Sequence, residues 1–197
     1  MKLDMAKAYD GMSWYFIIKM LRCFGFSEQW VSLIRRAIFC PWFSVLVNGV
    51  SHGFFFQSKG GLRQGNPLFP CLFIIATEFL SRGLDCIYTQ YLSVRYCSTT
   101  PIFVSYLSFA NDIIIFLNES RSSLWWVIKF LHHYKAVSGQ SINQAKSCFY
   151  IGTFASASRQ AIVHSITDFQ RLQLPFTYLV CSIFRGSFKI SHFDDMV

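Results

Sequence analysis

The sequence predicts an α+β fold, in which helices pack against an antiparallel sheet. Two short polar turns, Asn48-Gly49 and Asn111-Asp112, each lie between apolar, β-rich runs and are typical of hairpins. Segments with apolar residues at helical spacing, such as residues 14–24, separate these runs. Because hairpins join antiparallel strands, we expect an antiparallel sheet and not a parallel α/β sheet.

The elements follow from capping and turn signals. The expected helices, most of them bounded by a capping serine, a glycine or a proline, cover residues 14–24, 28–40, 67–88, 122–136 and 155–166. Pro67 fits the first turn of the long third helix. The expected strands cover residues 1–6, a hairpin within 43–56, the pair 102–107 and 113–117, residues 147–151, and an edge strand from 174 onward.

The composition restricts the class of protein. A length of 197 residues suits one domain, and 53% hydrophobic residues exclude a disordered chain. Only 14% of the residues are charged, against about a quarter in typical domains. We therefore expect other segments or a partner chain to cover part of the surface. The longest apolar stretch, Leu68 to Leu80, is shorter than the roughly 20 residues that span a bilayer, so we predict no membrane protein.

Charge and cysteine content indicate the partner and the compartment. The net charge of +8 favours an anionic partner, most commonly nucleic acid, although basic residues scattered over an ordinary surface would give the same charge. The seven cysteines form no Cys-x-x-Cys pair and several lie in apolar runs. We interpret them as small core residues of a reduced intracellular protein, in the nucleus or cytoplasm. No signal peptide is visible, so secretion is not expected.

Two acidic residues are candidate metal ligands. Asp4 ends the first expected strand, and Asp112 lies at a hairpin tip. Nucleotidyl transfer uses two divalent cations held by carboxylates that converge from different strands, because magnesium prefers oxygen ligands. Taken alone, a strand-end acid and an ordinary polar turn are the commoner explanation of these two residues.

Further motifs favour the chemical interpretation. The most informative segments, in chain order, are residues 3–10, 60–67, 109–112, 138–147 and 174–179. With these segments, the chain resembles the reverse transcriptase domain of LINE-type (non-LTR) retroelements, especially plant copies, from residue 1 to about 190. The segment Gly61-Leu62-Arg63-Gln64-Gly65, followed by x-Pro-Leu-x-Pro, is the most specific of them.

The resemblance implies a polymerase architecture. Residues 1–170 would form the palm, with a partial fingers insertion at about 40–60, and residues 171–197 would form the primer-grip strand and the beginning of the thumb connection. The implied activity is RNA-directed DNA polymerisation by two-metal nucleotidyl transfer. Its implied partners are an RNA template, a DNA primer and deoxynucleoside triphosphates, and its cofactor is Mg²⁺ or Mn²⁺, with two ions in an intact family member.

The resemblance also assigns roles to residues. The metal ligands would be Asp4, the backbone carbonyl of Met5, and Asp112. The catalytic group would comprise Asp4, Asn111, Asp112 and Lys146, whose amine approaches the pyrophosphate leaving group. The nucleotide-binding residues would be Tyr9, which excludes a 2′-hydroxyl beneath the sugar, and Arg63, Gln64 and Gly65. The primer grip would contain Pro175, Phe176, Tyr178 and Leu179, and Asp10 would cap the helix that follows it.

Several positions depart from the family pattern. Asn111 replaces the aspartate that would bridge both metals, and its amide oxygen lacks the negative charge that holds a divalent cation. The other replacements are Asn66 for an aspartate, Phe69 for a serine, Val180 for a glycine and Ser182 for a proline. We therefore expect a truncated, degenerate copy with impaired activity, which needs fingers and thumb segments or a partner chain.

Three alternatives remain open from sequence. A non-catalytic nucleic-acid-binding remnant would keep the groove without the metals, and metal-dependent primer extension separates it from a polymerase. A maturase-like RNA-binding palm would require a basic extension after the thumb. An ordinary apolar structural domain would make the ordered motifs accidental.

Overall fold

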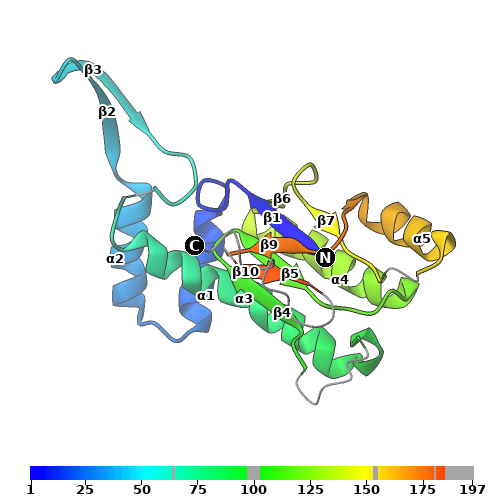
Figure 1. Ribbon diagram of the computed structural model, residues 1–197. Coiled ribbons are helices and arrows are strands. Elements are labelled where there is room, and N and C mark those ends of the chain that lie inside the picture. The colour runs from blue at the N-terminus through cyan, green and yellow to red at the C-terminus, as the bar shows by residue number, and fades with distance from the viewer. Residues whose placement is uncertain (64, 97–102, 153–154, 180, 185–197) are drawn as a thin grey trace.

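The computed structural model describes residues 1–63, 65–96, 103–152, 155–179 and 181–184 (Figure 1). The helices are α1 (Trp14–Cys23), α2 (Glu28–Phe39), α3 (Phe69–Gln90), the 3-10 helix η1 (Leu92–Val94), α4 (Arg121–Ser138) and α5 (Ala157–Thr167). The strands are β1 (Lys2–Ala6), β2 (Trp42–Val47), β3 (Val50–Gln57), β4 (Tyr106–Phe109), β5 (Asp112–Ile115), β6 (Ser141–Ile142), β7 (Cys148–Phe149), β8 (Gln170–Arg171), β9 (Phe176–Tyr178) and β10 (Cys181–Ile183). The predicted α+β class is confirmed.

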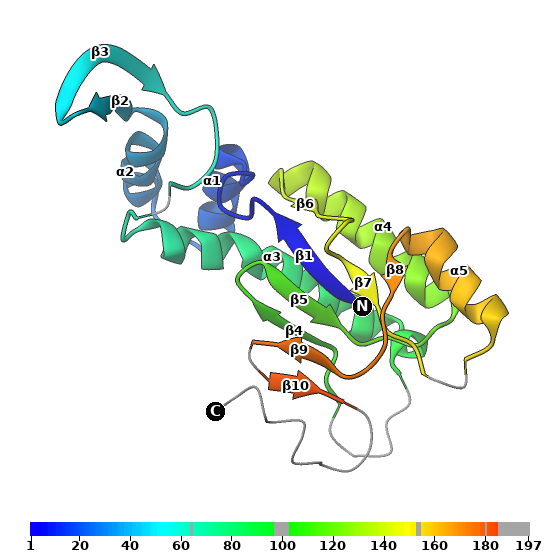
Figure 2. The same cartoon turned by 45° about the horizontal axis from the view of Figure 1, so that its top comes forward.

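Strand β1 lies in the middle of the main sheet, whose order is β4-β5-β1-β7-β8 (Figure 2). One edge of β1 pairs antiparallel with β5, and its other edge pairs antiparallel with β7 and then with β6. The described strands β7 and β8 run parallel, which departs from the predicted all-antiparallel arrangement. Both edges of β1 are thus covered by segments more than 100 residues away in sequence.

The core lies between this sheet and the helices. Burial alternates along β1, so that Leu3 and Met5 are buried in the core cluster while Asp4 is only partly buried. Successive side chains of a strand point to opposite faces, so Asp4 lies on the face away from that cluster. Side chains from α1, α3 and α4 complete the cluster, among them Ile17, Leu84 and Leu131. The hydrophobic side of β1 therefore fixes which way its acid points.

The Gly60-Gly61 turn packs directly on the loop that follows β1. Gly61 has φ +80°, and a Cβ atom added to it would lie 2.6 Å from the carbonyl oxygen of Asp10. The Gly61 amide donates to the Met12 carbonyl at 3.0 Å, and the Leu62 amide donates to the Tyr9 carbonyl at 2.8 Å. Only a glycine fits this combination of a left-handed backbone and a close backbone approach.

A second glycine holds the same loop from the side of α4. Gly139 ends α4 with φ +78°, and a Cβ atom there would lie 2.6 Å from the Gly11 carbonyl oxygen. Beside it, the Ser13 amide donates to the Ser138 carbonyl at 2.7 Å. The loop after β1 is therefore held between the Gly60-Gly61 turn, which precedes α3, and the C-terminal end of α4.

The β2–β3 hairpin projects from the body of the molecule (Figures 1 and 2). Its turn is the predicted Asn48-Gly49 pair, with φ +51° and +77°. Residues 42–57 contain no Lys, Arg, Asp or Glu. Large exposed apolar side chains on this hairpin are Trp42, Val45, Leu46, Val47, Val50, Phe55 and Phe56. Part of the apolar surface of the described residues is thus concentrated on one arm.

The structure corrects some of the expected boundaries. Pro70, and not Pro67, lies in the first turn of α3, which begins at Phe69. Asn66 closes the turn before this helix, since its Oδ1 accepts from the Leu68 amide at 2.9 Å. The strand expected over 147–151 is regular only over Cys148–Phe149.

The C-terminal strands form a small sheet of their own. Among the described residues, β9 pairs only with β10, in a two-stranded sheet separate from the main one, and so is an edge strand as the sequence predicts. Val180, where a glycine was expected, lies outside the described residues, whereas Ser182 pairs with Thr177 in β10.

The interpretation of the cysteines as core residues was wrong for most of those described. Cys148 is buried, but the other described cysteines are exposed, on helices, at a helix end or on strand β10: Cys23, Cys40, Cys71, Cys86 and Cys181. Helical periodicity explains this, because an apolar run long enough for a helix turns some of its residues to solvent. None of the described helices has both the length and the hydropathy needed to cross a bilayer.

We expect Gly61→Ala to lower the free energy of unfolding by about 1–3 kcal/mol, because an L-residue is strained at positive φ and its Cβ would meet backbone. Gly60→Ala is the matched control, since a Cβ atom at Gly60 meets nothing within 4 Å. That variant should change stability by no more than about 0.5 kcal/mol. Urea denaturation measures both, and equal midpoints would contradict the close approach at Gly61.

Candidate active site

Asp4 and Asp112 are direct cross-strand partners in the antiparallel pair β1–β5. Residues opposite each other in such a pair have Cβ atoms about 4.5–5.5 Å apart and point to the same face. Asp112 begins β5 after the two-residue turn Ala110-Asn111, where Ala110 has φ +51°. The hairpin tip thus brings one carboxylate next to another from a strand far away in sequence.

Asn111 joins the hairpin tip to β1 through two hydrogen bonds. Its side-chain Nδ2 donates to Oδ1 of Asp4 at 3.1 Å. Its backbone carbonyl accepts from the Met5 amide at 2.8 Å. The residue that replaces the expected aspartate therefore contacts the neighbouring acid as a donor.

The turn between β6 and β7 holds the backbone of Asp4 from the other edge. The Asn143 amide donates to the Asp4 carbonyl at 2.8 Å, and the Asp4 amide donates to Ser147 Oγ at 3.1 Å. Lys146 lies between these two residues and is exposed. Asn143 and Ser147 were not singled out from sequence, although both belong to the segment that identified Lys146.

A pocket of about 530 Å³ opens at this junction. Its lining contains the strand end, the following loop, the hairpin tip and the β6–β7 turn, namely Asp4, Met5, Ala6, Lys7, Ala8, Tyr9, Asp10, Ala110, Asn111, Asn143 and Lys146. The Tyr9 ring stacks on Phe73 of α3, with the ring centroids 4.4 Å apart. Tyr9 therefore packs against the core and also lines the pocket.

A buried glutamine fixes the loop that forms one wall of the pocket. Gln140 is 1% exposed, and its Nε2 donates to the Ala8 carbonyl at 2.8 Å. Its Oε1 accepts from the Tyr134 hydroxyl. Burial raises the pKa of Tyr134, so this hydroxyl stays protonated and remains a donor. Gln140 was not singled out from the sequence. A glutamine that follows a helix-ending glycine carries no local sign that it will be buried.

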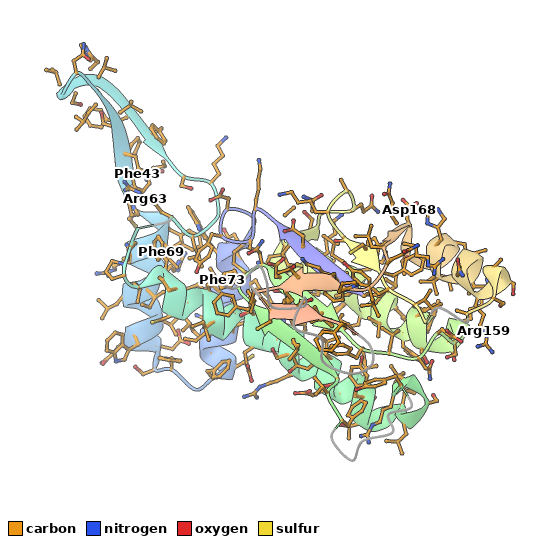
Figure 3. The ribbon with its side chains drawn as sticks, in the orientation of Figure 1. Phe43, Arg63, Phe69, Phe73, Arg159 and Asp168 are labelled. Atoms are coloured by element: carbon orange, nitrogen blue, oxygen red, sulfur yellow. The ribbon has the colours of Figure 1, made fainter. Side chains whose placement is uncertain are left out.

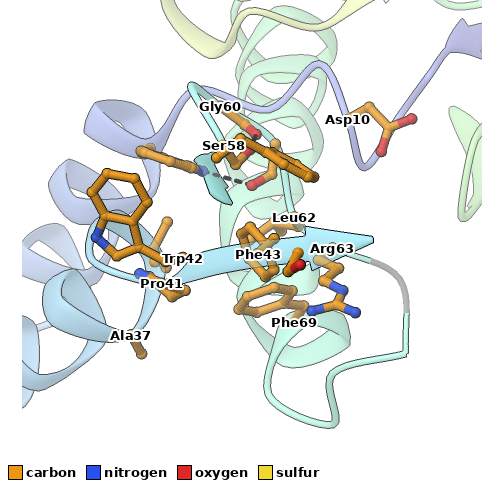
Figure 4. Close-up of a pocket in the computed structure, with 15 residues that line it drawn as sticks. Asp10, Ala37, Pro41, Trp42, Phe43, Ser58, Gly60, Leu62, Arg63 and Phe69 are labelled. Atoms are coloured by element: carbon orange, nitrogen blue, oxygen red, sulfur yellow. Dashed lines mark hydrogen bonds between the residues drawn. The ribbon is translucent and has the colours of Figure 1, made fainter. Parts of the chain in front are cut away.

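The structure separates Arg63 from the acids. Arg63 lies over the Phe43 ring, 4.8 Å from its centroid, at the base of the β2–β3 hairpin (Figure 3). It lines a different pocket of about 550 Å³ that includes several aromatic side chains, with Phe43 and Phe69 near the guanidinium (Figure 4). Asp10 lines both pockets and lies apart from the aromatic group.

Two other residues of the glycine-rich loop, and Asp10, were also assigned roles from the sequence. Gly65 lies in the same loop as Arg63 and lines a smaller hollow beside it. Gln64, expected to contact the nucleotide, lies outside the described residues. Asp10 does not cap α1, because Ser13 is the N-cap and its Oγ accepts from the Phe16 amide. A residue three positions before the cap is too far from the first helical turn for that role.

The β9 strand lies beside the hairpin that carries Asp112. The Tyr178 hydroxyl donates to the Asp112 carbonyl at 3.4 Å, and Lys2 Nζ donates to the Thr177 carbonyl at 3.4 Å. Burial raises the pKa of Tyr178, and the negative charge of Asp112 raises it further. Phe176 stacks on Tyr150 with the ring centroids 3.9 Å apart. Pro175 and Leu179 flank this strand and are exposed.

The acidic residues fit one divalent cation better than two. Mg²⁺ commonly binds proteins through one or two carboxylates, with water and substrate phosphates completing its shell. Asp4 and Asp112 can supply such a pair. A second ion bridged to the first needs another carboxylate at the tip, where Asn111 stands. In the described part of the chain, no three His, Cys, Asp or Glu side chains form a group that could hold a metal.

Opposed carboxylates at a strand end and a hairpin tip, on an α+β sheet, offer the oxygen ligands that metal-dependent nucleotidyl transfer uses. The family described as "Reverse transcriptase (RNA-dependent DNA polymerase)" matches residues 1–183. The chain therefore belongs to the reverse transcriptase family, and members of this family generally use divalent metal ions. The predicted family is confirmed.

Two curated relatives belong to R2 retroelements. The "Retrovirus-related Pol polyprotein from type-2 retrotransposable element R2DM" of Drosophila melanogaster is 25% identical over 167 residues, which are 85% of this chain and 15% of the relative. The "Retrovirus-related Pol polyprotein from type-1 retrotransposable element R2" of Popillia japonica is 29% identical over 115 residues, 57% of this chain and 18% of the relative. The predicted non-LTR affinity is thus confirmed, and the plant affinity stays a prediction. The chain spans less than a fifth of the length of either relative.

We expect Gln140→Leu to cost about 1–3 kcal/mol in the free energy of unfolding, because the Ala8 carbonyl and the Tyr134 hydroxyl would lose their buried partner. Gln144→Leu, the same change at an exposed position four residues later, should stay within about 0.5 kcal/mol. Chemical denaturation of both variants measures the difference. A Gln140→Leu variant as stable as the control would exclude the anchoring role.

Proposed function

We propose that this chain is the palm of an RNA-directed DNA polymerase that acts on an RNA template and a DNA primer, and that its own polymerisation is impaired. The observation that carries the proposal is the register pairing of Asp4 with Asp112 beside a pocket that Tyr9 and Lys146 also line. This combination supports nucleotidyl transfer because the Asp4 carboxylate, an aromatic ring and a lysine line one pocket, and Asp112 lies opposite Asp4 in the sheet.

Asp4 and Asp112 would hold Mg²⁺ or Mn²⁺, with the Met5 carbonyl as a further ligand. A divalent cation bound there would supply activation of the primer hydroxyl and neutralisation of phosphate charge. Lys146, which is exposed and lines this pocket, would offset negative charge on the departing pyrophosphate. Tyr9, held flat by Phe73, would lie beneath the sugar and exclude a 2′-hydroxyl.

We assign the projecting β2–β3 hairpin, which falls within the expected insertion at about 40–60, to the fingers. The contact of Tyr178 with the Asp112 backbone supports β9 as the primer grip, because it lies next to the acid that would act at the primer end. Arg63 and Gly65 would contact the template or the incoming nucleotide from the neighbouring pocket. Gln64 would belong to the same surface.

The proposed impairment rests on charge. With Asn111 in place of an aspartate, the tip carries one carboxylate where the family pattern has two. Losing a single preorganised electrostatic group commonly costs on the order of 10²–10³ in rate. The hydrogen bond from Asn111 to Asp4 also favours a second candidate, a nucleic-acid-binding palm without catalysis, because that bond holds the site together without a metal.

We expect the purified chain to extend a labelled DNA primer on an RNA template very little in Mg²⁺ or Mn²⁺, because one bridging charge is missing. Asp4→Asn sets the background, since it removes the central carboxylate. Wild type and Asp4→Asn should be nearly indistinguishable in a gel-based extension assay. Robust, template-directed synthesis that Asp4→Asn abolishes would support the polymerase assignment and contradict the impairment.

We expect template–primer binding to weaken steeply as salt rises, because binding through phosphates releases counterions. Lys146→Ala should reduce the affinity and the salt slope, since Lys146 lines the pocket beside the acids. Lys19→Ala, on α1 and also exposed, is the control and should change neither. Fluorescence anisotropy at several salt concentrations measures both quantities. An affinity that does not change with salt concentration, or that falls equally in the two variants, would contradict a nucleic-acid site at this pocket.

A further inference from the structure

The Asn111 side chain makes a direct polar contact between two elements that each carry an acid. Its Nδ2 lies 3.1 Å from Oδ1 of Asp4, and its own hairpin continues into Asp112. A carboxylate only accepts hydrogen bonds, whereas an asparagine amide can donate. The identity of the donor at this contact therefore follows from chemistry: the amide nitrogen faces Asp4.

The backbone brings the Asn111 side chain close to the Asp4 carboxylate. The Met5 amide donates to the Asn111 carbonyl at 2.8 Å, and Asp4 is paired with Asp112 in the ladder. The hairpin tip therefore lies against β1, where the Asn111 side chain adds a polar contact to the backbone ladder. An aspartate at position 111 would place its carboxylate against that of Asp4, with Asp112 as a third negative group nearby. Like charges this close repel strongly unless a cation lies between them.

We propose that Asn111 replaces a bridging cation as a structural link, so that the hairpin tip is held on β1 without divalent metal and the site takes at most one metal ion. The amide uses one acceptor position of Asp4 and removes one negative charge from the tip. This inference rests on the proposed function, because it assumes that the site of Asp4 and Asp112 binds a divalent metal ion. It adds that, in this chain, the tip is stable in the metal-free state.

Thermal unfolding of Asn111→Asp, with EDTA or with excess Mn²⁺ at neutral pH, tests the link. In EDTA its Tm should fall by on the order of 4 °C relative to wild type, and Mn²⁺ should restore most of that loss. The wild-type Tm should respond much less to Mn²⁺. Asn48→Asp is the matched control, because it makes the same change at the other hairpin turn and should be insensitive to metal.

A second variant and a metal count complete the test. Asn111→Ala removes the hydrogen bond without adding charge, so its Tm should fall in both conditions and Mn²⁺ should not restore it. Electron paramagnetic resonance should detect at most one site-bound Mn²⁺ in wild type and more in Asn111→Asp. The proposal is overturned if Mn²⁺ stabilises wild type as much as Asn111→Asp, or if Asn111→Asp melts like wild type in EDTA.

These measurements contain no nucleic acid, so they separate the two proposals. Failure of the palm assignment would appear as template–primer binding that does not depend on Lys146. The melting curves would then still report whether Asn111 links the tip to β1. Conversely, the template–primer could bind in a Lys146-dependent way while the Tm of Asn111→Asp does not respond to metal. That result would reject the structural link of Asn111 and leave the palm assignment in place.

Discussion

The central placement of β1 is the constraint on which the rest of this structure depends. A strand in the middle of a sheet must have its amides and carbonyls satisfied on both edges, because buried unpaired backbone groups are costly. Here β5 supplies one edge, and β6 and β7 share the other. The loop that leaves β1 is then held by the Gly61 turn and by the side chain of Gln140. Segments around residues 61–62, 112–115 and 140–149 thus converge on the first strand and the loop that follows it.

The candidate active site is a consequence of that convergence. The alternation of β1 buries Leu3 and Met5, so Asp4 must face the other way, and the register with β5 brings Asp112 opposite to it. The same β6–β7 turn that bonds to the Asp4 backbone brings Lys146 to the pocket edge. Folding and site assembly therefore use the same hydrogen bonds. A weakened clamp at Gly61 or Gln140 would be expected to disturb the wall that carries Tyr9 even where the acids remain paired.

The projecting hairpin and the paired acids have opposite physical characters. Residues 42–57 carry no acidic or strongly basic side chain, and Trp42 and Leu46 are 64% and 65% exposed. An exposed apolar arm of this kind is the usual mark of a contact surface or of an association-prone one. Arg63, stacked on Phe43 at its base, connects the arm to the second pocket, and Asp10 borders both pockets. A ligand that extends from the acids toward the arm would pass Asp10.

Local signals in the sequence by themselves determined the helices with capping serines, the two polar hairpin turns, the α+β class and the reverse transcriptase family. Those signals depend on neighbouring residues, as at Ser13 and Asn48-Gly49. The sequence also singled out Asp4, Asp112, Lys146 and Tyr9, but it placed Arg63 with them and assigned a cap to Asp10. Only the tertiary structure decided that Arg63 lies on Phe43, that Asn111 donates to Asp4, and that Gln140, Asn143 and Ser147 support the site. The physical reason is that these contacts join residues far apart in the chain, and their geometry is set by strand register and by close backbone approach, neither of which leaves a local pattern.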